Sequence, residues 1–151
     1  MMMTALLVGA LEIKTERPVP GEPIWVRMTI TNGSAQEVVI VNPEVGVPPP
    51  YLDWIASDKA YQIAVLMSFG VVKITLKNAD GQLVESKGLM PWVTPILGKR
   101  ALQPQDSLVL DFDLSELFSI HLAGLYSVQM HYGDNTVYAD ISTDIEIGPT
   151  R

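Results

Sequence analysis

The sequence predicts an all-β protein: a single β-sandwich domain over residues 1–151, with about nine strands in two antiparallel sheets. Apolar and polar residues alternate with a period of two through most of the chain, which is typical of strands that bury one face. No long segment repeats at helical spacing, and no internal repeat is visible. Hydrophobic residues make up 48% of the 151 residues, which is enough apolar material for one core.

The first part of the chain predicts three strands. Residues 5–13 form an apolar run, and residues 24–31 alternate between aliphatic side chains at even positions and mostly polar ones at odd positions. Because successive side chains of a strand point to opposite faces, the even positions should be buried. Residues 32–34 (Asn-Gly-Ser) supply turn chemistry before a third strand at residues 38–41.

The middle of the chain combines a long loop with a predicted hairpin. Residues 43–59 contain three consecutive prolines, which exclude a central strand and predict a long surface loop. A further strand is expected at residues 61–67. Residues 72–77 alternate again, and the turn residues 78–81 should return the chain antiparallel to them through residues 83–84.

The last part predicts three strands and one helical turn. The strands are expected at residues 108–114, 125–132 and 137–147, and the helical turn at residues 114–118. Asp113 or Ser115 could act as the N-cap of that turn. Acidic residues take the outward positions of the first and last of these strands, so both should present an acidic face to solvent. These residues are Asp111, Asp113, Asp140, Asp144 and Glu146.

Two stretches of the chain resemble immunoglobulin-like and fibronectin III-like modules of bacteria. The first is Val19-Pro20-Gly21-Glu22-Pro23-Ile24, which leads into a strand ending at Thr31-Asn32-Gly33-Ser34. The second is Leu122-Ala123-Gly124-Leu125-Tyr126, which resembles a tyrosine corner, where the phenol hydroxyl bonds the backbone a few residues upstream. The resemblance implies an immunoglobulin-like sandwich in which Tyr126 has this structural role. Val128 stands where antibody domains carry a Cys, which implies a disulfide-free member.

Charge and composition disfavour several classes of partner. The chain has 10 Lys and Arg against 17 Asp and Glu, and residues 101–150 hold no basic residue against eight acidic ones. This balance argues against nucleic acid as a partner. The apolar run that ends at Leu11 has no basic residue before it and is too short to cross a bilayer. We therefore expect no membrane insertion, and a cytoplasmic location rather than secretion.

The residue types that usually carry catalysis or hold metal are scarce. The chain has no Cys and only two His, His121 and His131, and it lacks the spacings of metal-binding, nucleophile and phosphate-binding motifs. The acidic strand residues do not favour Ca²⁺, because ligands along flat strands cannot wrap an ion as a loop does. We therefore expect no enzyme activity, no metal site and no cofactor. A His in a cleft, within hydrogen-bond reach of a carboxylate and a hydroxyl, would instead favour an enzyme.

Aromatic side chains are the candidate binding residues. Tyr51, Asp53 and Trp54 lie in the proline-rich segment, Trp92 lies beside another proline, and Trp25 takes an outward position on its strand. These rings could anchor a protein partner, stack on a sugar with Asp53 as a hydrogen-bonding neighbour, or fold back over the ends of the sandwich.

The expected function is that of a non-catalytic protein-interaction or assembly module, which includes an inhibitor or an accessory subunit. A charged fraction of only 18%, a mean hydropathy of +0.23 and the long proline-rich loop favour a protein partner or self-association. Such a surface should bury about 800 Å² per partner and contain Trp54 or Trp25. Carbohydrate binding through the loop aromatics is the alternative.

Overall fold

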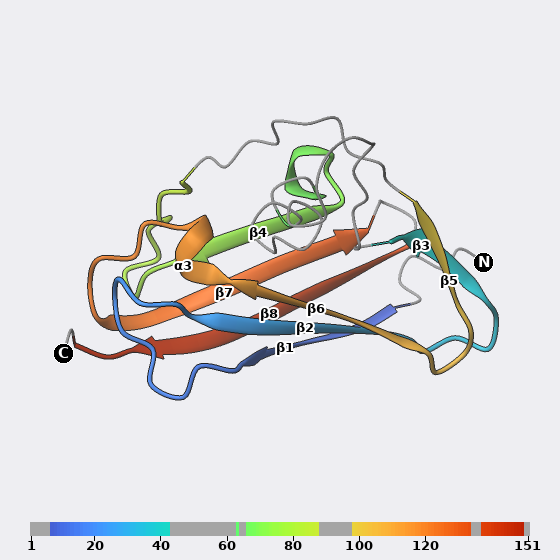
Figure 1. The fold of residues 1–151 in the computed structure, drawn as a ribbon, viewed down its shortest axis with the longest axis horizontal. Helices are drawn as coiled ribbons and strands as arrows, with labels where there is room; N and C mark the ends of the chain where they lie inside the picture. The colour runs from blue at the N-terminus through green and yellow to red at the C-terminus, as the bar shows by residue number, and fades with distance from the viewer. Residues whose placement is uncertain (1–6, 43–62, 64–65, 88–97, 134–136, 150–151) are drawn as a thin grey trace, which may run out of the picture.

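The computed structural model describes residues 7–42, 63, 66–87, 98–133 and 137–149 (Figure 1). These residues form eight strands, the short helix α3 (Leu114–Leu117) and a helical segment that includes residues 66–68. The strands are β1 (Leu7–Ile13), β2 (Trp25–Asn32), β3 (Val38–Val41), β4 (Val72–Lys77), β5 (Lys99–Leu102), β6 (Ser107–Asp113), β7 (Gly124–Gly133) and β8 (Tyr138–Ile147). None of the helices described is long and apolar enough to cross a membrane.

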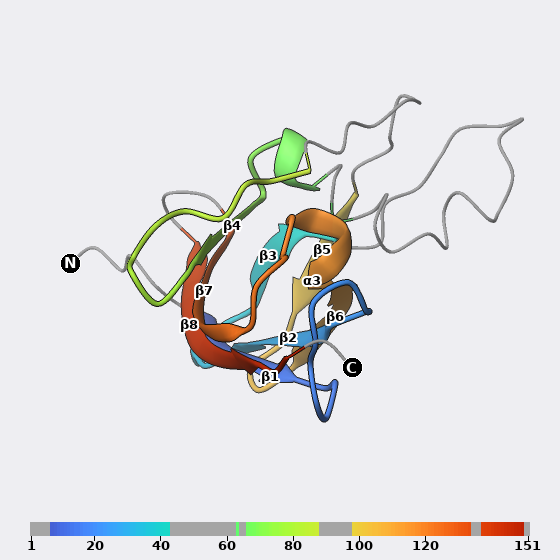
Figure 2. The ribbon, with the colours of Figure 1, turned by 90° about the vertical axis from the view of Figure 1, so that its left-hand side faces the viewer.

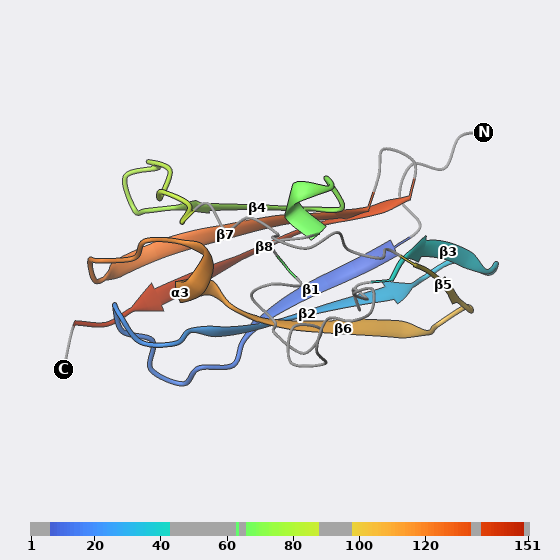
Figure 3. The same ribbon diagram turned by 45° about the horizontal axis from the view of Figure 1, so that its top comes forward.

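The strands form the two layers of an immunoglobulin-like sandwich, as the sequence predicts. One sheet has the order β1-β2-β6 and the other β4-β7-β8, while β3 pairs with β5 in a small two-stranded sheet. Every pairing is antiparallel. The two larger sheets correspond to the A-B-E and C-F-G strands of an immunoglobulin-like domain. Figures 2 and 3 show the two layers and β1 lying beside β8 at one side of the sandwich.

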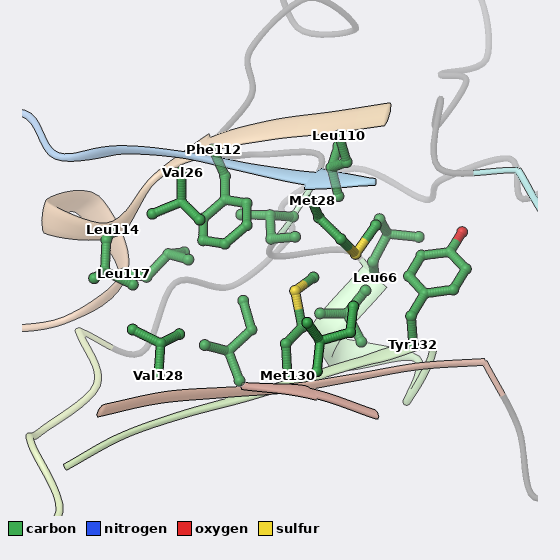
Figure 4. Close-up of a cluster of buried hydrophobic side chains, with 14 of the residues drawn as sticks. Val26, Met28, Leu66, Leu110, Phe112, Leu114, Leu117, Val128, Met130 and Tyr132 are labelled. Carbon is green, nitrogen blue, oxygen red and sulfur yellow. The ribbon is translucent and has the colours of Figure 1, made fainter. Parts of the chain in front are cut away.

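The predicted alternation produces the core. In β2 the even residues Val26, Met28 and Ile30 have no exposed surface, whereas the odd residues are partly or well exposed. Figure 4 shows side chains of β2 and β6 pointing toward those of β7 across the space between the layers. Burying one such side chain contributes about 1.5–3 kcal/mol, so the core supplies the main stabilising free energy of the fold.

Gly9 permits the close approach of β1 to β8. A Cβ atom at this position would lie 2.4 Å from the side chain of Ile141. Only a residue without a side chain therefore fits between the two layers here.

The connection from β6 to β7 closes one end of the sandwich. Asp113 is buried and caps α3, because its Oδ1 accepts hydrogen bonds from the backbone N–H of Ser115 at 3.0 Å and from that of Ile24 at 2.8 Å. The side chains of Leu114 and Leu117 are buried under the helix. Further along, the Tyr126 hydroxyl donates to the carbonyl oxygen of Leu122 at 2.6 Å, which confirms the tyrosine corner.

The opposite end is held by buried polar side chains. Asn32 has no exposed surface, and its amide donates to the carbonyl oxygens of Gln36 and Leu102, both at 2.8 Å. Tyr132 donates its hydroxyl to the carbonyl oxygen of Val41 at 2.6 Å. Burial raises the pKa of the Tyr132 phenol well above its ordinary value of 10. These bonds tie β2, β3, β5 and β7 together.

The strand expected at residues 61–67 is wrong, because the described part of this segment is helical. Ile63 and Leu66 are three residues apart and fully buried, which matches one face of a helix. The segment ends at Gly70, whose φ is +75°. The N–H of Val71 donates to Leu66 and that of Gly70 donates to Met67, which is the hydrogen-bond pattern of a Schellman cap. The period was ambiguous because almost every residue in the run is apolar.

The predicted hairpin after β4 forms only in part. The turn at residues 78–81 is present, and Leu83 makes an isolated bridge to Lys77. The chain then leaves the sheet and bridges from Ser86 to Phe118, beside α3. The full ladder partner of β4 is instead β7, which is distant in the sequence.

The acidic outer face predicted for β6 is also wrong at Asp113, which is buried rather than exposed. The strand ends at this residue, so its carboxylate turns inward as the cap of α3. The acidic face predicted for β8 is confirmed: Asp140, Asp144 and Glu146 are exposed.

Candidate functional site

The outward side chains of β1, β2 and β6 form a surface with few charges, which we call the β1-β2-β6 outer face. Register places Val8, Thr31 and Ser107 in one row across the three strands, and the next row holds Ala10, Thr29 and Val109. Val8 is 63% exposed and Val109 is 52% exposed. In these two rows, large aliphatic side chains thus stand in solvent among small residues.

One row of this face is charged, and the charges of its residues partly neutralise one another. Arg27 donates from Nε and Nη2 to the two carboxylate oxygens of Asp111, at 2.8 and 3.0 Å, and Glu12 is its neighbour in register on β1. The hydrogen bond to Asp111, with a smaller contribution from Glu12, raises the pKa of Arg27. Because the pair is well exposed, solvent screens it and its contribution to stability is small. The two hydrogen bonds hold the guanidinium of Arg27 beside Asp111.

Trp25 lies at the end of the same face. Its side chain is in the same outward phase as Arg27, and the residue is 40% exposed. The backbone is fixed on both sides: the N–H of Trp25 donates to Thr15 Oγ1, and its carbonyl oxygen accepts from Lys14, both at 2.8 Å. The other residues proposed from the sequence, Tyr51, Asp53, Trp54 and Trp92, lie outside the described residues.

The outward side chains of β4, β7 and β8 form the contrasting β4-β7-β8 outer face, in which most rows carry a charged residue. Register places Lys73, His131 and Asp140 in one row. Two rows away along the sheet, Lys77 and Asp144 occupy the edge strands. The row between these two is neutral and consists of Thr75, Gln129 and Ser142.

His131 is held by a carboxylate. Its Nδ1 lies 2.6 Å from Asp140 Oδ1, and its ring stacks on Tyr138 with centroids 5.2 Å apart. If Nδ1 carries the proton that Asp140 accepts, Nε2 of a neutral ring is left as an acceptor. No hydroxyl among the described residues makes a hydrogen bond to the imidazole. His131 therefore has the carboxylate partner, but not the hydroxyl partner, that would favour an enzyme site. His121 is exposed at the other end of the molecule.

The His131 row lines an open hollow at the end of the sandwich beside β3 and β5. The cavity volume is about 1110 Å³, and its lining includes Lys73, Lys99, Val39 and Phe69. Within the described part of the chain, no group of three or more His, Asp or Glu side chains could hold a metal ion.

Sequence reasoning missed this hollow for a topological reason. Its lining comes from β3, β4, β5, β7 and β8, and the pairing of β3 with β5 is not signalled by any local motif. The one local signal is the alternation along residues 125–132, in which His131 takes the phase opposite to the apolar residues Val128 and Met130. Its carboxylate partner became visible only with the register of β7 on β8.

Fold and register together define this chain as an immunoglobulin-like β-sandwich without a disulfide. No family model matches the chain, and no curated protein matches it. Solved structures share the fold. The CARDB domain of the PF1109 protein from Pyrococcus furiosus is 10% identical, with a TM-score of 0.44, over 94% of this chain and 87% of that one.

Two other solved structures differ widely in what they do. The bacterial hydrophobin BslA is 9% identical, with a TM-score of 0.42, over 99% of this chain and 98% of that one. A β-glucosidase, EmGH1 from Erythrobacter marinus, is 10% identical with a TM-score of 0.46, and the match covers 94% of this chain but 15% of the enzyme. At these identities and scores the likenesses carry no argument about function.

Proposed function

We propose that this chain is a non-catalytic protein-interaction module that binds its partner through the β1-β2-β6 outer face. The observation that carries the proposal is the exposure of Val8, Val109 and Trp25 on that one face. Apolar side chains on a surface with few charges are what the centre of a protein interface requires.

The surroundings of these side chains support the same function. Ala10, Thr29 and Thr31 surround Val8 and Val109, so at these two rows a partner would meet short side chains with little entropy to lose. The charged row of this face lies between the two valines and Trp25. Arg27, the cation within these three strands, is already bonded to Asp111. Covering Val8 and Val109 would contribute about 1–2 kcal/mol each to binding.

The partner is either a second copy of this chain or a different protein, as for an inhibitor or an accessory subunit. The strand β6, at the edge of this sheet away from β1, also presents a backbone edge that a partner strand could extend. Both forms of the module use the same face, so one pair of variants tests both.

The test places charge on the two opposite faces of the sandwich. In the double variant Val8→Glu and Val109→Glu, we expect loss of concentration-dependent self-association in sedimentation velocity, or loss of the proteins cross-linked to the wild-type chain in its host. The matched control carries Thr75→Glu and Ser142→Glu on the β4-β7-β8 outer face and should keep both. Equal behaviour of the two double variants, or a wild-type chain that has no partner in either assay, would contradict the proposal.

A further inference from the structure

The open hollow at the β3–β5 end is large enough for a small organic molecule. Its volume of about 1110 Å³ exceeds the roughly 300–1,000 Å³ of typical ligand pockets. Its lining comes from the start of β4, the end of β7, the start of β8, and from β3 and β5. Figure 1 shows that these parts of the strands lie at the same end of the molecule. Five strands and the helical segment before Gly70 therefore contribute to it, which fixes the positions of its lining on regular elements.

One wall of the hollow is apolar and in contact with solvent. Val39 is 51% exposed and Phe69 is 57% exposed, although both are large apolar side chains. Phe69 directly precedes Gly70, the residue with positive φ that ends the helical segment. The hydrogen bonds of this helix cap therefore fix the backbone that carries the Phe69 side chain. Val41, Met67 and Val137 continue this wall. An apolar ligand group placed here would release water from both surfaces.

The charged part of the lining is cationic. Lys73 and Lys99 are exposed and line the hollow, whereas Asp140 is the one acidic residue among its described lining. Asp140 is hydrogen-bonded to His131. Among the described lining, the two ammonium groups exceed the one carboxylate by one positive charge, in a chain of net charge -7. An anion is therefore favoured here and disfavoured over most of the remaining surface.

We propose that this hollow binds an amphipathic organic anion, a small molecule with one carboxylate and an apolar body. The carboxylate lies near Lys73 and Lys99, and the apolar body packs against Val39 and Phe69. Gln129 and Ser142 offer neutral hydrogen bonds along the rim. This site is separate from the β1-β2-β6 outer face, so it adds a ligand to the proposed module and does not depend on it.

The test uses two probes with the same apolar tail and opposite charge. Isothermal titration of the full chain with sodium octanoate should give saturable binding at one site. Octyltrimethylammonium should bind at least about tenfold more weakly, and added salt should weaken octanoate binding. Absence of saturable octanoate binding, or equal binding of the two probes, would overturn the proposal.

A pair of double variants locates the site. Lys73→Gln with Lys99→Gln should weaken octanoate binding about tenfold, which is the combined effect of two exposed ion pairs. Lys14→Gln with Lys77→Gln removes two charges outside the hollow and should leave the affinity unchanged. Phe69→Ser should weaken both probes, because it alters the apolar wall. Equal losses in the two double variants would show that octanoate responds to net charge alone and would end the proposal.

Discussion

The two ends of the sandwich are held by different means. At the α3 end, a helical turn buries Leu114 and Leu117 in the core, Asp113 bonds the start of β2, and Tyr126 fixes the corner into β7. At the β3–β5 end, two four-residue strands pair with each other, and a wide hollow opens between them and the β4-β7-β8 sheet. Figure 1 shows α3 and the β3–β5 pair at opposite ends of the long axis.

The comparison shows that one end of the sandwich contributes stability and the other end leaves room for a ligand. A plug of buried side chains contributes hydrophobic free energy but leaves no room for a ligand. A two-stranded sheet is marginal by itself, so β3 and β5 depend on the bonds from Asn32 and Tyr132 to the rest of the fold. An end closed in this way can keep an open hollow, at the cost of lower local stability.

The largest expected effect is on the free energy of unfolding, when a buried side chain is removed at one end and an exposed side chain at the other. Leu114→Ala removes a fully buried side chain at the α3 end, so the free energy of unfolding should fall by about 2–5 kcal/mol. Val39→Ala, at the open end, removes a side chain that is already half in solvent and should cost about 0.5 kcal/mol or less. Urea denaturation of both variants measures this difference. Similar losses of stability in the two variants would contradict it.

An intermediate effect is expected at the cap of α3. Asp113→Ala leaves the buried N–H of Ile24 without its acceptor and removes the helix cap, so unfolding should require about 1–3 kcal/mol less free energy. Asp113→Asn keeps an acceptor oxygen in place and should recover a large part of the loss. If the two variants unfold at the same urea concentration, the hydrogen bonds at this corner do not stabilise the end.

The smallest expected effect concerns the two buried tyrosines of β7. Tyr126→Phe should lower the free energy of unfolding by about 1 kcal/mol, because one hydrogen bond to Leu122 is lost.

The pKa of Tyr132 is raised by burial, so the folded state favours the neutral phenol. Its stabilising contribution is complete below the ordinary phenol pKa and is lost as pH rises above about 10. The alkaline loss of stability should be less steep in Tyr132→Phe, and identical pH profiles would contradict this.

The sequence predicts the α3 end better than the open end, because more of the contacts at the α3 end join residues that are close in the sequence. Tyr126 and Leu122 are four residues apart, and Asp113 precedes the helix it caps, so both features are visible as local motifs. Even there, the second partner of Asp113 is Ile24, 89 residues away, and this long-range bond explains why the carboxylate is buried.

At the open end, the deciding contacts are long-range. β3 pairs with β5, and Tyr132 bonds Val41 from 91 residues away. Alternation predicts which residues of β7 face outward, but not which strand brings Asp140 to His131, nor that Lys99 and Lys73 line the same hollow. Candidate residues can be read from one sequence, whereas a site made by five strands requires their order.

Native-state amide hydrogen exchange of the full chain tests the contrast between the two ends most directly. The amides of Leu114 and Val128 should exchange only through global unfolding, and those of Ile40 and Arg100, a hydrogen-bonded pair of β3 and β5, should exchange through a smaller, local opening at the same denaturant concentrations. Equal protection at the two ends, with exchange at β3 and β5 limited by global unfolding, would contradict this account.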